Sequence, residues 1–437
     1  MKKVTTRAIA VLLLAALVVA GMGVYLFRLI RDGGQWAAFY ANDSVYTRGQ
    51  LNRGTVTDRN DVVLATAGED SFHYAESADV RRACLHVVGD LAGNIGTSIL
   101  SNYRPRLINY SFFTGTTTEG GAVKLTVDAN VSAAAYKALN GRKGTVLVYN
   151  YKTGEIICMV STPGWDPEQG VTFDVNDSAY EGAFINRAIS SSFTPGSVFK
   201  LVTMAAAIET IPDIWQQTFT CTGETVIGGQ RIKCTGVHGT ITAEQGLAHS
   251  CNIVFGELGR QLGGALISAY AEKYGLTSEH TMNDIPTAAG SVPVGEGDGD
   301  AAWAAIGQYD DLVNPYAFLR FVGAIANSGT VVEPTVLYGE KCGSEKLMDA
   351  STAQRLSEMM SYNVELEYGS WNFPGLQMHA KTGTAEVGDG STHAWFAGFI
   401  SNANAPLAFV VLAERSGGGF AVAAPIANTV LQKAVNG

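Results

Sequence analysis

The sequence predicts a mixed α/β (α+β) protein: a domain with a central antiparallel sheet flanked by helices, a smaller extended N-terminal module and one transmembrane helix. Three observations predict this class. Beyond residue 140, β-rich segments lie on both sides of a helical middle, a turn-rich stretch precedes them, and an uncharged apolar run lies near the N-terminus. Strands from the two ends of one domain can pair into a single sheet that the helices between them cover.

Length and composition narrow the functional class. The chain has 437 residues, which is too long for one ordinary domain, and its 46% apolar and 16% charged residues are typical of a protein with a sizeable core. It carries 30 basic and 40 acidic residues, a net charge of −10 that argues against nucleic-acid binding through phosphate contacts. We find no repeat of fixed period, so a solenoid or propeller is not expected.

The N-terminal segment is typical of a membrane anchor. The twenty residues Ala8–Phe27 carry no charge, and a helix of that length spans roughly 30 Å, the thickness of the hydrocarbon core. A secretory signal peptide is the alternative, but its apolar region is usually shorter, about 7–15 residues. Lys2, Lys3 and Arg7 favour a cytoplasmic N-terminus. We expect residues 1–33 to form a cytoplasmic stub and a single-pass anchor in the plasma membrane, with the rest of the chain outside the cytoplasm.

Residues 34–140 are expected to form the extended N-terminal module. Within Arg53–Ala65, two short β-rich runs flank a turn, which predicts a hairpin. Thr126–Ala138 is rich in alanine and starts with a capping residue, Asp128, so it predicts a helix. We place the start of the next domain near residue 141.

Residues 141–437 carry the predicted sheet and most of the helices. Strands are predicted at Gly144–Tyr149, Glu155–Val160, Thr392–Ile400 and Leu407–Ala413, with an edge strand around Gln377–Val387. Apolar residues at i, i+3 and i+4 predict helices at Ser197–Glu209, Ala243–Leu262 and Asn314–Asn327, and a last helix covers Ala421–Val435.

The six cysteines show no metal-binding spacing. The chain has no C-x-x-C and no H-E-x-x-H, so the sequence gives zinc little support, and no feature requires another metal or an organic cofactor. A hairpin turned at Gly228-Gly229 would bring Cys221 and Cys234 close enough for a disulfide; two half-buried free thiols are the alternative. The other four are expected to be small buried hydrophobes: Cys84, Cys158, Cys251 and Cys342.

A single S-x-x-K, from Ser197 to Lys200, follows Thr194-Pro195-Gly196. Proline favours a helix start, and a serine in the first turn lies at the positive end of the helix dipole. Lys200, three residues on, returns to the same face, so its amine can reach the Ser197 hydroxyl. A lysine can activate a serine if burial and neighbouring positive charge lower its pKa.

K-T-G occurs twice. Lys152-Thr153-Gly154 joins two predicted strands and is interpreted as a surface turn. Lys381-Thr382-Gly383-Thr384 lies on the predicted edge strand, where Gly383 lets another backbone approach closely.

S-x-N occurs three times. Ser361-Tyr362-Asn363 and Ser370-Trp371-Asn372 lie in a turn-rich connection and are interpreted as surface turns or caps. Ser250-Cys251-Asn252 lies between two helical segments, so it is the copy expected to point into a cleft.

Taken in order, S-x-x-K, S-x-N 53 residues later and K-T-G-T 131 residues after that resemble the penicillin-recognising serine acyltransferases. Further segments are similar to class B penicillin-binding proteins: Arg53–Ala65, His86–Gly89, Leu125–Asp128, Asn186–Ala188 and Trp395–Gly398. Three places depart from the family pattern: Asp61 where glycine is usual, Tyr309 in a G-Q-G stretch, and Asn314-Pro315 for Thr-Pro.

The resemblance implies a penicillin-binding transpeptidase fold for residues 141–437 and a pedestal or dimerisation-type module for 34–140. It implies a D,D-transpeptidase that cross-links peptidoglycan stem peptides ending in D-Ala-D-Ala and is blocked covalently by β-lactams. It also implies a membrane-embedded SEDS-family glycan polymerase as partner, reached through the anchor and the N-terminal module.

The resemblance implies roles for the matched residues. Ser197 attacks the donor carbonyl with Lys200 as general base, Ser250 relays a proton to the departing D-alanine, and Asn252 holds the donor's amide. The backbone amides of Ser197 and Thr384 stabilise the oxyanion. The terminal carboxylate is bound around Lys381, Thr382, Gly383 and Thr384.

Two other functional classes compete with this hypothesis. A β-lactamase or D,D-carboxypeptidase needs a water-activating group, for which the sequence offers no convincing counterpart. A non-catalytic β-lactam sensor should carry further membrane spans or a cytoplasmic signalling part, and a pure scaffold would not need all of the motif residues intact. His249, His393 and Glu386 flank the motifs, and for these we expect structural or solvated roles only.

Overall fold

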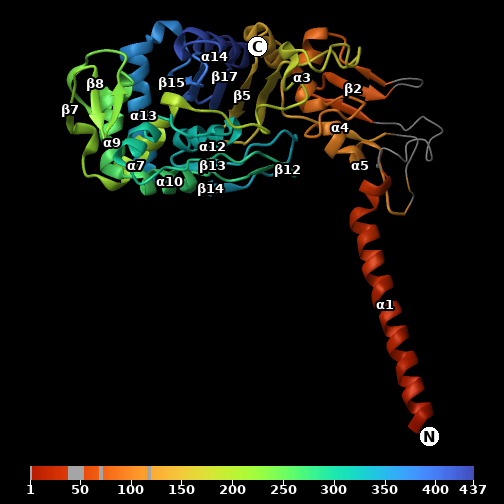
Figure 1. Ribbon diagram of the computed structural model, residues 1–437. Coiled ribbons are helices and arrows are strands. Elements are labelled where there is room, and N and C mark those ends of the chain that lie inside the picture. Colours follow the sequence, from red (N-terminus) through yellow and green to blue (C-terminus); the bar gives the residue numbers. More distant parts are fainter. Residues whose placement is uncertain (1, 38–53, 68–71, 114, 116–119) are drawn as a thin grey trace.

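The computed structural model describes residues 2–37, 54–67, 72–113, 115 and 120–437. A long N-terminal helix, α1 (Lys2–Ala37), projects from a small β-rich module, which adjoins a larger domain (Figure 1). Within the described residues α1 is the one helix long and apolar enough to cross a membrane, and its apolar stretch is not buried inside the protein. It therefore fits the predicted single-pass anchor.

The N-terminal module is built on a four-stranded sheet in the order β3-β2-β1-β4. Its strands are β1 (Thr55–Thr57), β2 (Val63–Ala67), β3 (Phe72–Tyr74) and β4 (Ala122–Lys124), and its helices are α3 (Ala78–Val88), α4 (Ile99–Asn102) and α5 (Arg104–Leu107). The predicted hairpin is β1 paired antiparallel with β2, although Arg53 lies outside the described residues. Asp61, at the usual glycine position, has φ 65.

The larger domain has a five-stranded antiparallel sheet in the order β15-β16-β17-β5-β6. The strands are β5 (Gly144–Asn150), β6 (Ile156–Thr162), β15 (Met378–Glu386), β16 (Thr392–Ile400) and β17 (Leu407–Ala413). The two ends of the domain therefore close one sheet, as predicted, and β15 is an edge strand. Helix α6 (Ala129–Leu139) is capped by Asp128, whose carboxylate accepts from the amides of Asn130 and Val131.

Helices cover both faces of this sheet, with α14 (Gly419–Asn436) on one side and α12 (Pro315–Ala326) on the other (Figure 1). Alternate residues of each strand supply the two cores. Val146 and Val148 join the core under α14 and α6, whereas Leu147 and Tyr149 join the core under α12. Because both faces are covered, the strands are nearly continuous apolar runs.

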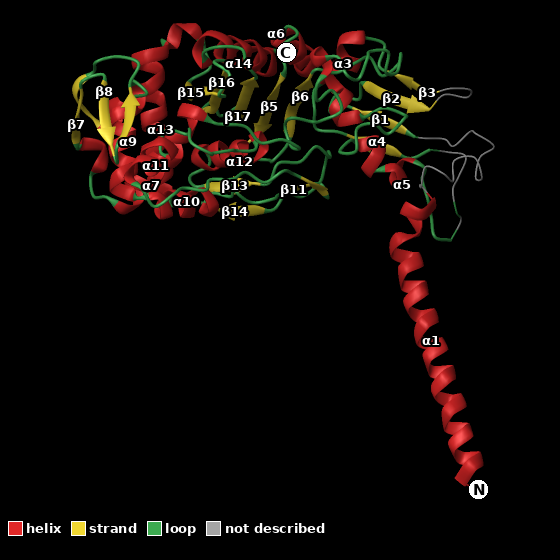
Figure 2. Cartoon of the chain, viewed as in Figure 1, coloured by secondary structure: helices red, strands yellow, loops and turns green. Residues whose placement is uncertain are grey.

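A group of helices lies between the sheet and a small β-lobe (Figure 2). These helices are α7 (Lys200–Thr210), α8 (Ala243–Ala248), α9 (Asn252–Leu262), α10 (Gly264–Lys273), α11 (Asp298–Ala304) and α13 (Ala350–Asn363). The single helix predicted across 243–262 is wrong: α8 and α9 are separated by a turn in which Ser250 has φ 52. The surface turn predicted for Ser361-Asn363 is also wrong, because Asn363 ends α13, is buried and donates to the Ala380 carbonyl.

The small lobe contains two strand pairs, β7 (Thr218–Cys221) with β10 (Gly239–Thr242) and β8 (Glu224–Ile227) with β9 (Gln230–Lys233). The predicted turn at Gly228-Gly229 joins β8 to β9. All six cysteines are free, so the Cys221–Cys234 disulfide is not formed. Cys342 is half-buried rather than buried, contrary to prediction. The remaining strands are β11 (Thr281–Met282), β12 (Ile285–Pro286), β13 (Thr330–Val332) and β14 (Ser344–Lys346).

Candidate active site

Ser197 lies in a tight turn that is held against the edge strand β15. The turn is a single 3₁₀ segment (Gly196–Phe199) that leads directly into α7. Gly196 has φ 55, and a Cβ there would lie 2.8 Å from the Thr384 carbonyl oxygen. Gly383 was predicted to allow a close backbone approach, and a Cβ there would lie 2.8 Å from the Pro195 oxygen. Small residues on both sides thus bring Ser197 beside β15.

Lys200 occupies the first turn of α7 and is fully buried. Its Nζ donates to the Ser250 carbonyl (2.6 Å), the Ser250 hydroxyl (3.2 Å) and the Asn252 side-chain oxygen (2.7 Å). The Ser197 hydroxyl is not among its hydrogen-bond partners in the described residues. Burial lowers the pKa of the Lys200 ammonium to about 7. The neutral amine, which can accept a proton, is therefore well populated at neutral pH.

Ser250 connects two lysines. Its hydroxyl lies 3.2 Å from Lys200 Nζ and 3.0 Å from Lys381 Nζ. The turn between α8 and α9 directs it there with a left-handed backbone, an uncommon conformation for a residue that is not glycine. The hydroxyl can accept from one amine and donate to the other, which is what a proton relay requires.

Lys381 lies on β15 and is also fully buried. Besides the Ser250 hydroxyl, its Nζ donates to the Thr382 carbonyl oxygen at 3.0 Å. Burial and the nearby Lys200 ammonium lower the pKa of Lys381 well below its usual range. Two buried amines that share one hydroxyl therefore hold fewer protons at neutral pH than exposed lysines would.

Asn252 is the first residue of α9, and both ends of its side-chain amide are occupied. The oxygen accepts from Lys200, and the nitrogen donates to the Lys233 carbonyl at 2.8 Å. The structure thus brings together Ser250, Asn252, Lys200 and Lys381, the residues of three sequence motifs.

The hydroxyls next to Lys381 differ in their partners. The Thr382 hydroxyl hydrogen-bonds with the Tyr368 hydroxyl at 3.0 Å. The Tyr368 hydroxyl also accepts from the Thr382 amide. The Thr384 hydroxyl accepts from the Gly419 amide at 3.1 Å and keeps its own proton available. Burial raises the pKa of Tyr368 to about 12, so it is a neutral hydrogen-bonding group. Tyr368 belongs to no motif, so sequence reasoning could not single it out.

Ser197 opens into a cleft of about 350 Å³. The cleft is lined by Ser197, Arg231, Lys233, Asn252, Trp303, Ile306, Gln308, Thr384 and Glu386. Sequence reasoning missed the two cations of β9, Arg231 and Lys233, and the apolar wall of Trp303 and Ile306. Gln308 was noted only as part of the stretch that resembles G-Q-G and departs from it at Tyr309.

Of the residues for which the sequence indicated no catalytic role, Glu386 lines the cleft, whereas Lys152, His249 and His393 do not. Lys152, in the first K-T-G, is exposed and donates to the Asn327 side chain at 2.8 Å. His249 hydrogen-bonds with Glu367, and His393 accepts from the Arg415 amide. Among the described residues, one group of side chains could hold a metal ion, and none of its members lines the cleft.

Comparisons with known proteins bear on the family and the fold of the chain. The penicillin-binding protein transpeptidase domain family matches residues 144–432. Peptidoglycan D,D-transpeptidase PbpA of Mycobacterium tuberculosis is 28% identical over 93% of this chain and 89% of the relative. The ceftriaxone acyl-enzyme structure of M. tuberculosis penicillin-binding protein A has a TM-score of 0.76 at 25% identity, over 88% of this chain and 98% of that one. The D,D-transpeptidase domain structure from Eggerthella lenta has a TM-score of 0.73 at 26% identity, with the same coverage.

Proposed function

The chain belongs to the penicillin-binding protein transpeptidase family, and from that premise we propose how its cleft catalyses peptidoglycan cross-linking. The protein is a peptidoglycan D,D-transpeptidase, a serine acyltransferase that β-lactams acylate. The observation that carries the residue assignment is the shared Ser250 hydroxyl, which lies within hydrogen-bond distance of two buried lysine amines.

In the first step, Ser197 attacks the carbonyl of the penultimate D-alanine of a donor stem peptide. A bond forms between the serine oxygen and that carbon, and neutral Lys200 takes the serine proton. The amides of Ser197 and Thr384 stabilise the oxyanion, a contribution of about 3 kcal/mol for each donor.

The proton then has to reach the leaving group. Lys200 passes it through the Ser250 hydroxyl to the nitrogen of the terminal D-alanine as the peptide bond breaks. Asn252 holds the donor's amide at the same side of the cleft. The short distances from Ser250 to Lys200 and Lys381 support this route.

The second step transfers the acyl group to an amine of a neighbouring stem peptide. The amine nitrogen bonds to the acyl carbon, the ester bond to Ser197 breaks, and the amine's proton returns to the serine oxygen through Lys200. A β-lactam follows the first step only, because its leaving group stays tethered in the cleft.

The donor's terminal carboxylate binds at β15. We assign it to Lys381 and to the Thr384 hydroxyl, whose proton is not used in the hydrogen bond from Gly419. Thr382 acts with them through the Tyr368 contact, which fixes its hydroxyl. Gly383 keeps the strand close to the Ser197 turn.

The test is covalent labelling of the full chain in detergent with a fluorescent penicillin. Wild type is compared with Ser197→Ala, Lys200→Ala and Lys381→Ala, and with Lys152→Ala as a matched control from the other K-T-G. We expect a stable labelled band for wild type and Lys152→Ala, none for Ser197→Ala, and acylation slowed at least about 10²-fold for Lys200→Ala.

The lifetime of the label and the identity of the acylated residue decide the outcome. A band that persists for hours supports the transpeptidase, whereas one that decays within seconds would indicate a hydrolase. A band that survives in Ser197→Ala, with the label mapped to another residue, would overturn the assignment of the nucleophile.

We also propose that the N-terminus of α1 is cytoplasmic and that a membrane-embedded SEDS-family glycan polymerase binds α1 and the N-terminal module. The three basic residues before the apolar run and the exposed apolar surface of α1 support this arrangement. Protease accessibility of N-terminal and C-terminal tags in intact spheroplasts tests the orientation. Crosslinking from photoreactive residues in α1 tests the partner.

A further inference from the structure

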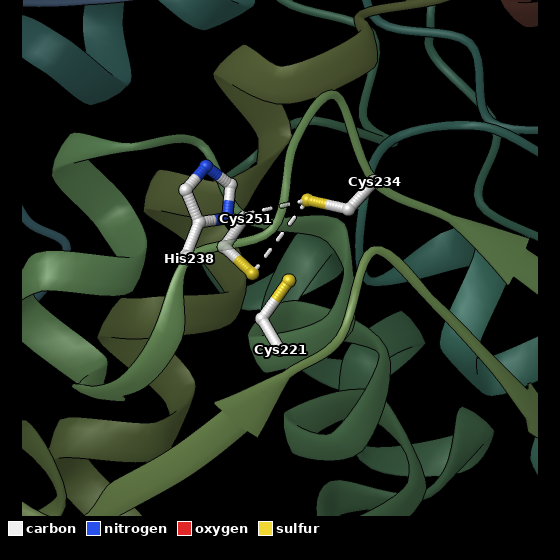
Figure 3. Close-up of side chains that lie close together, drawn as sticks. All are labelled: Cys221, Cys234, His238 and Cys251. Atoms are coloured by element: carbon white, nitrogen blue, oxygen red, sulfur yellow. Dashed lines mark hydrogen bonds between the residues drawn. The ribbon is translucent and has the colours of Figure 1, made fainter.

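Four side chains of types that bind metals lie close together at the S-x-N turn. They are Cys221, Cys234, His238 and Cys251, and Figure 3 shows the three sulfurs and the imidazole directed toward a common centre. Their ligand atoms all lie within 4.8 Å of one another. None of the four has a role in the acyl transfer described above.

The spacing matches the ligand shell of a tetrahedral zinc ion. With Zn–S of about 2.3 Å and Zn–N of about 2.0–2.1 Å, two sulfurs in such a shell lie about 3.8 Å apart and a sulfur and a nitrogen about 3.6 Å apart. Cys234 Sγ lies 3.7 Å from Cys251 Sγ and 3.6 Å from His238 Nδ1. The widest pair, at most 4.8 Å, would close by about 1 Å.

The ligands come from three separate segments. Cys221 ends β7 and pairs with Gly239 of β10, which places His238 beside it. Cys234 follows β9, and its amide is fixed by the Gly223 carbonyl at 2.8 Å. Cys251 stands at the start of α9. Cys221 and Cys251 are buried while the other two are half-buried, so an ion can reach the group from solvent.

We propose that these four residues form a structural zinc site of the Cys₃His type. Binding of Zn²⁺ would displace the three thiol protons to solvent and leave His238 neutral, with Nδ1 as the ligand and the proton on Nε2. Three thiolates and one divalent cation give the site a net charge of −1. Four protein ligands fill the tetrahedral shell, which is the arrangement of structural rather than catalytic zinc.

The chemistry of the donors favours zinc over a disulfide. A Cys234–Cys251 disulfide would use two of the four groups and would not explain why Cys221 and His238 lie beside them. Among the common divalent ions, zinc prefers thiolate and imidazole ligands, whereas magnesium and calcium prefer oxygen ligands.

The ion would tie the β-lobe to the catalytic machinery. Cys251 lies between Ser250 and Asn252, and the residue before Cys234 is Lys233, whose carbonyl accepts from Asn252. His238 stacks on His249 at 5.1 Å, the residue that precedes Ser250. We therefore assign the four ligands as positioning residues for Ser250 and Asn252, and this second part rests on the proposed function.

The first measurement is the zinc content of the full chain, purified in detergent and dialysed against buffer without metal. We expect about one zinc per chain, release of that zinc when the thiols are blocked with a mercurial, and loss from Cys234→Ser and His238→Ala. Cys342→Ser is the matched control, because Cys342 is a half-buried free thiol outside the group, and it should keep its zinc.

A second variant and a spectroscopic probe guard against simple misfolding. His238→Cys replaces the imidazole by a fourth thiolate and, unlike His238→Ala, should bind zinc. The cobalt-substituted chain should show the d–d bands of tetrahedral cobalt and thiolate-to-cobalt charge transfer, and His238→Cys should shift the d–d bands while keeping them intense. Zinc-free wild type should acylate with a β-lactam at least about tenfold more slowly and recover when zinc is added.

The measurement of metal content does not depend on acyl transfer, so the zinc site and the proposed function can each be overturned without the other. The zinc site is overturned if reduced, folded wild type binds no zinc, if Cys234→Ser retains as much zinc as wild type, or if mass spectrometry of the isolated chain finds a Cys234–Cys251 disulfide. Full zinc occupancy with unchanged acylation after its removal would overturn the positioning role alone. Zinc binding with no acylation at all would contradict the proposed function and leave the site intact.

Discussion

Lys200 and Lys381 are the two residues whose charge state decides how this site works. Each is fully buried, and neither has a carboxylate among its hydrogen-bond partners in the described residues. Keeping two ammonium groups in a dry pocket is costly, so desolvation favours the neutral amines. The shared Ser250 hydroxyl can bond to either protonation state. Burial and the shared hydroxyl therefore support the proposed roles of Lys200 as catalytic base and Ser250 as proton relay.

The pH dependence of acylation should report Lys200. Its pKa, lowered by burial to about 7, makes the neutral base roughly 10% of the population at pH 6 and 90% at pH 8. The second-order rate of β-lactam acylation should therefore rise about tenfold between these values and level off above. Stopped-flow labelling between pH 5.5 and 8.5 measures it. A flat profile over this range would rule out a base with this pKa.

Two substitutions of Ser250 separate the loss of its hydroxyl from the strain of its backbone conformation. Its left-handed φ of 52 disfavours alanine but suits glycine, so Ser250→Gly should be about 1 kcal/mol more stable than Ser250→Ala. Both variants lack the relay and should slow acylation alike, by about 10²-fold. Thermal unfolding and labelling rates measure the two effects, with Ser370→Ala from another S-x-N as control. Rates that followed stability instead would contradict the relay.

Sequence reasoning found the residues that short motifs carry and missed those that only folding brings together. Ser197 and Lys200 are three residues apart, so helical geometry alone predicts their shared face. Tyr368 reaches Thr382 from a separate helical segment and has no motif. The Cys₃His group was missed for the same reason: its members span 31 residues without a C-x-x-C, and the sequence suggested only a Cys221–Cys234 disulfide or two free thiols.

At the scale of elements, the Ser197 turn depends on a backbone contact with the segment after α11. A Cβ on Gly307 would lie 2.0 Å from the Gly196 carbonyl oxygen, and the Gly196 amide donates to the Gly307 oxygen at 2.8 Å. The turn, β15 and this segment are therefore packed backbone to backbone. Side chains cannot be added there without moving Ser197.

Gly307→Ala and Gly141→Ala form a matched pair for this contact. Their φ values are 74 and 76, but a Cβ at Gly141 would meet nothing within 4 Å. Gly141→Ala should cost about 1–2 kcal/mol from backbone strain and leave acylation unchanged. Gly307→Ala should cost about 1–3 kcal/mol more from overpacking and slow acylation. Unfolding temperatures and labelling rates measure both, and equal behaviour of the pair would refute the contact.

The elements that were predicted correctly are those whose signal is local. Asp128 and Asn314 cap their helices through side-chain acceptors, and the strands at 392–400 and 407–413 begin and end as predicted. Ser250–Asn252 was expected to lie between two helical segments, but the apolar periodicity continues across 249–251, so the pattern alone also predicted one helix over 243–262. The reason for the break is tertiary: Ser250 must face Lys200 and Lys381.

At the scale of the whole molecule, the catalytic part and the anchor are nearly independent. Only the end of α1 touches the described remainder of the chain: Gly33 and Gly34 lie against Tyr110 and Pro105, and Ala37 packs on Ile108. The five-stranded sheet and the β-lobe lie away from α1 (Figure 1). The apolar surface of α1 therefore fits a membrane anchor and contributes little to the packing of the described remainder of the chain.

This separation predicts the behaviour of two truncations. Deletion of residues 1–30 removes the apolar run but keeps Ala37 on Ile108, so the protein should move from the membrane to the soluble fraction and acylate at the rate of the full chain. Deletion of residues 1–37 also uncovers Ile108, and should be less stable by about 1 kcal/mol without losing acylation. Membrane fractionation, unfolding temperature and penicillin labelling measure the three properties. If the shorter deletion lost acylation while remaining folded, α1 would be part of the catalytic unit, and the boundary between anchor and enzyme would have to be redrawn.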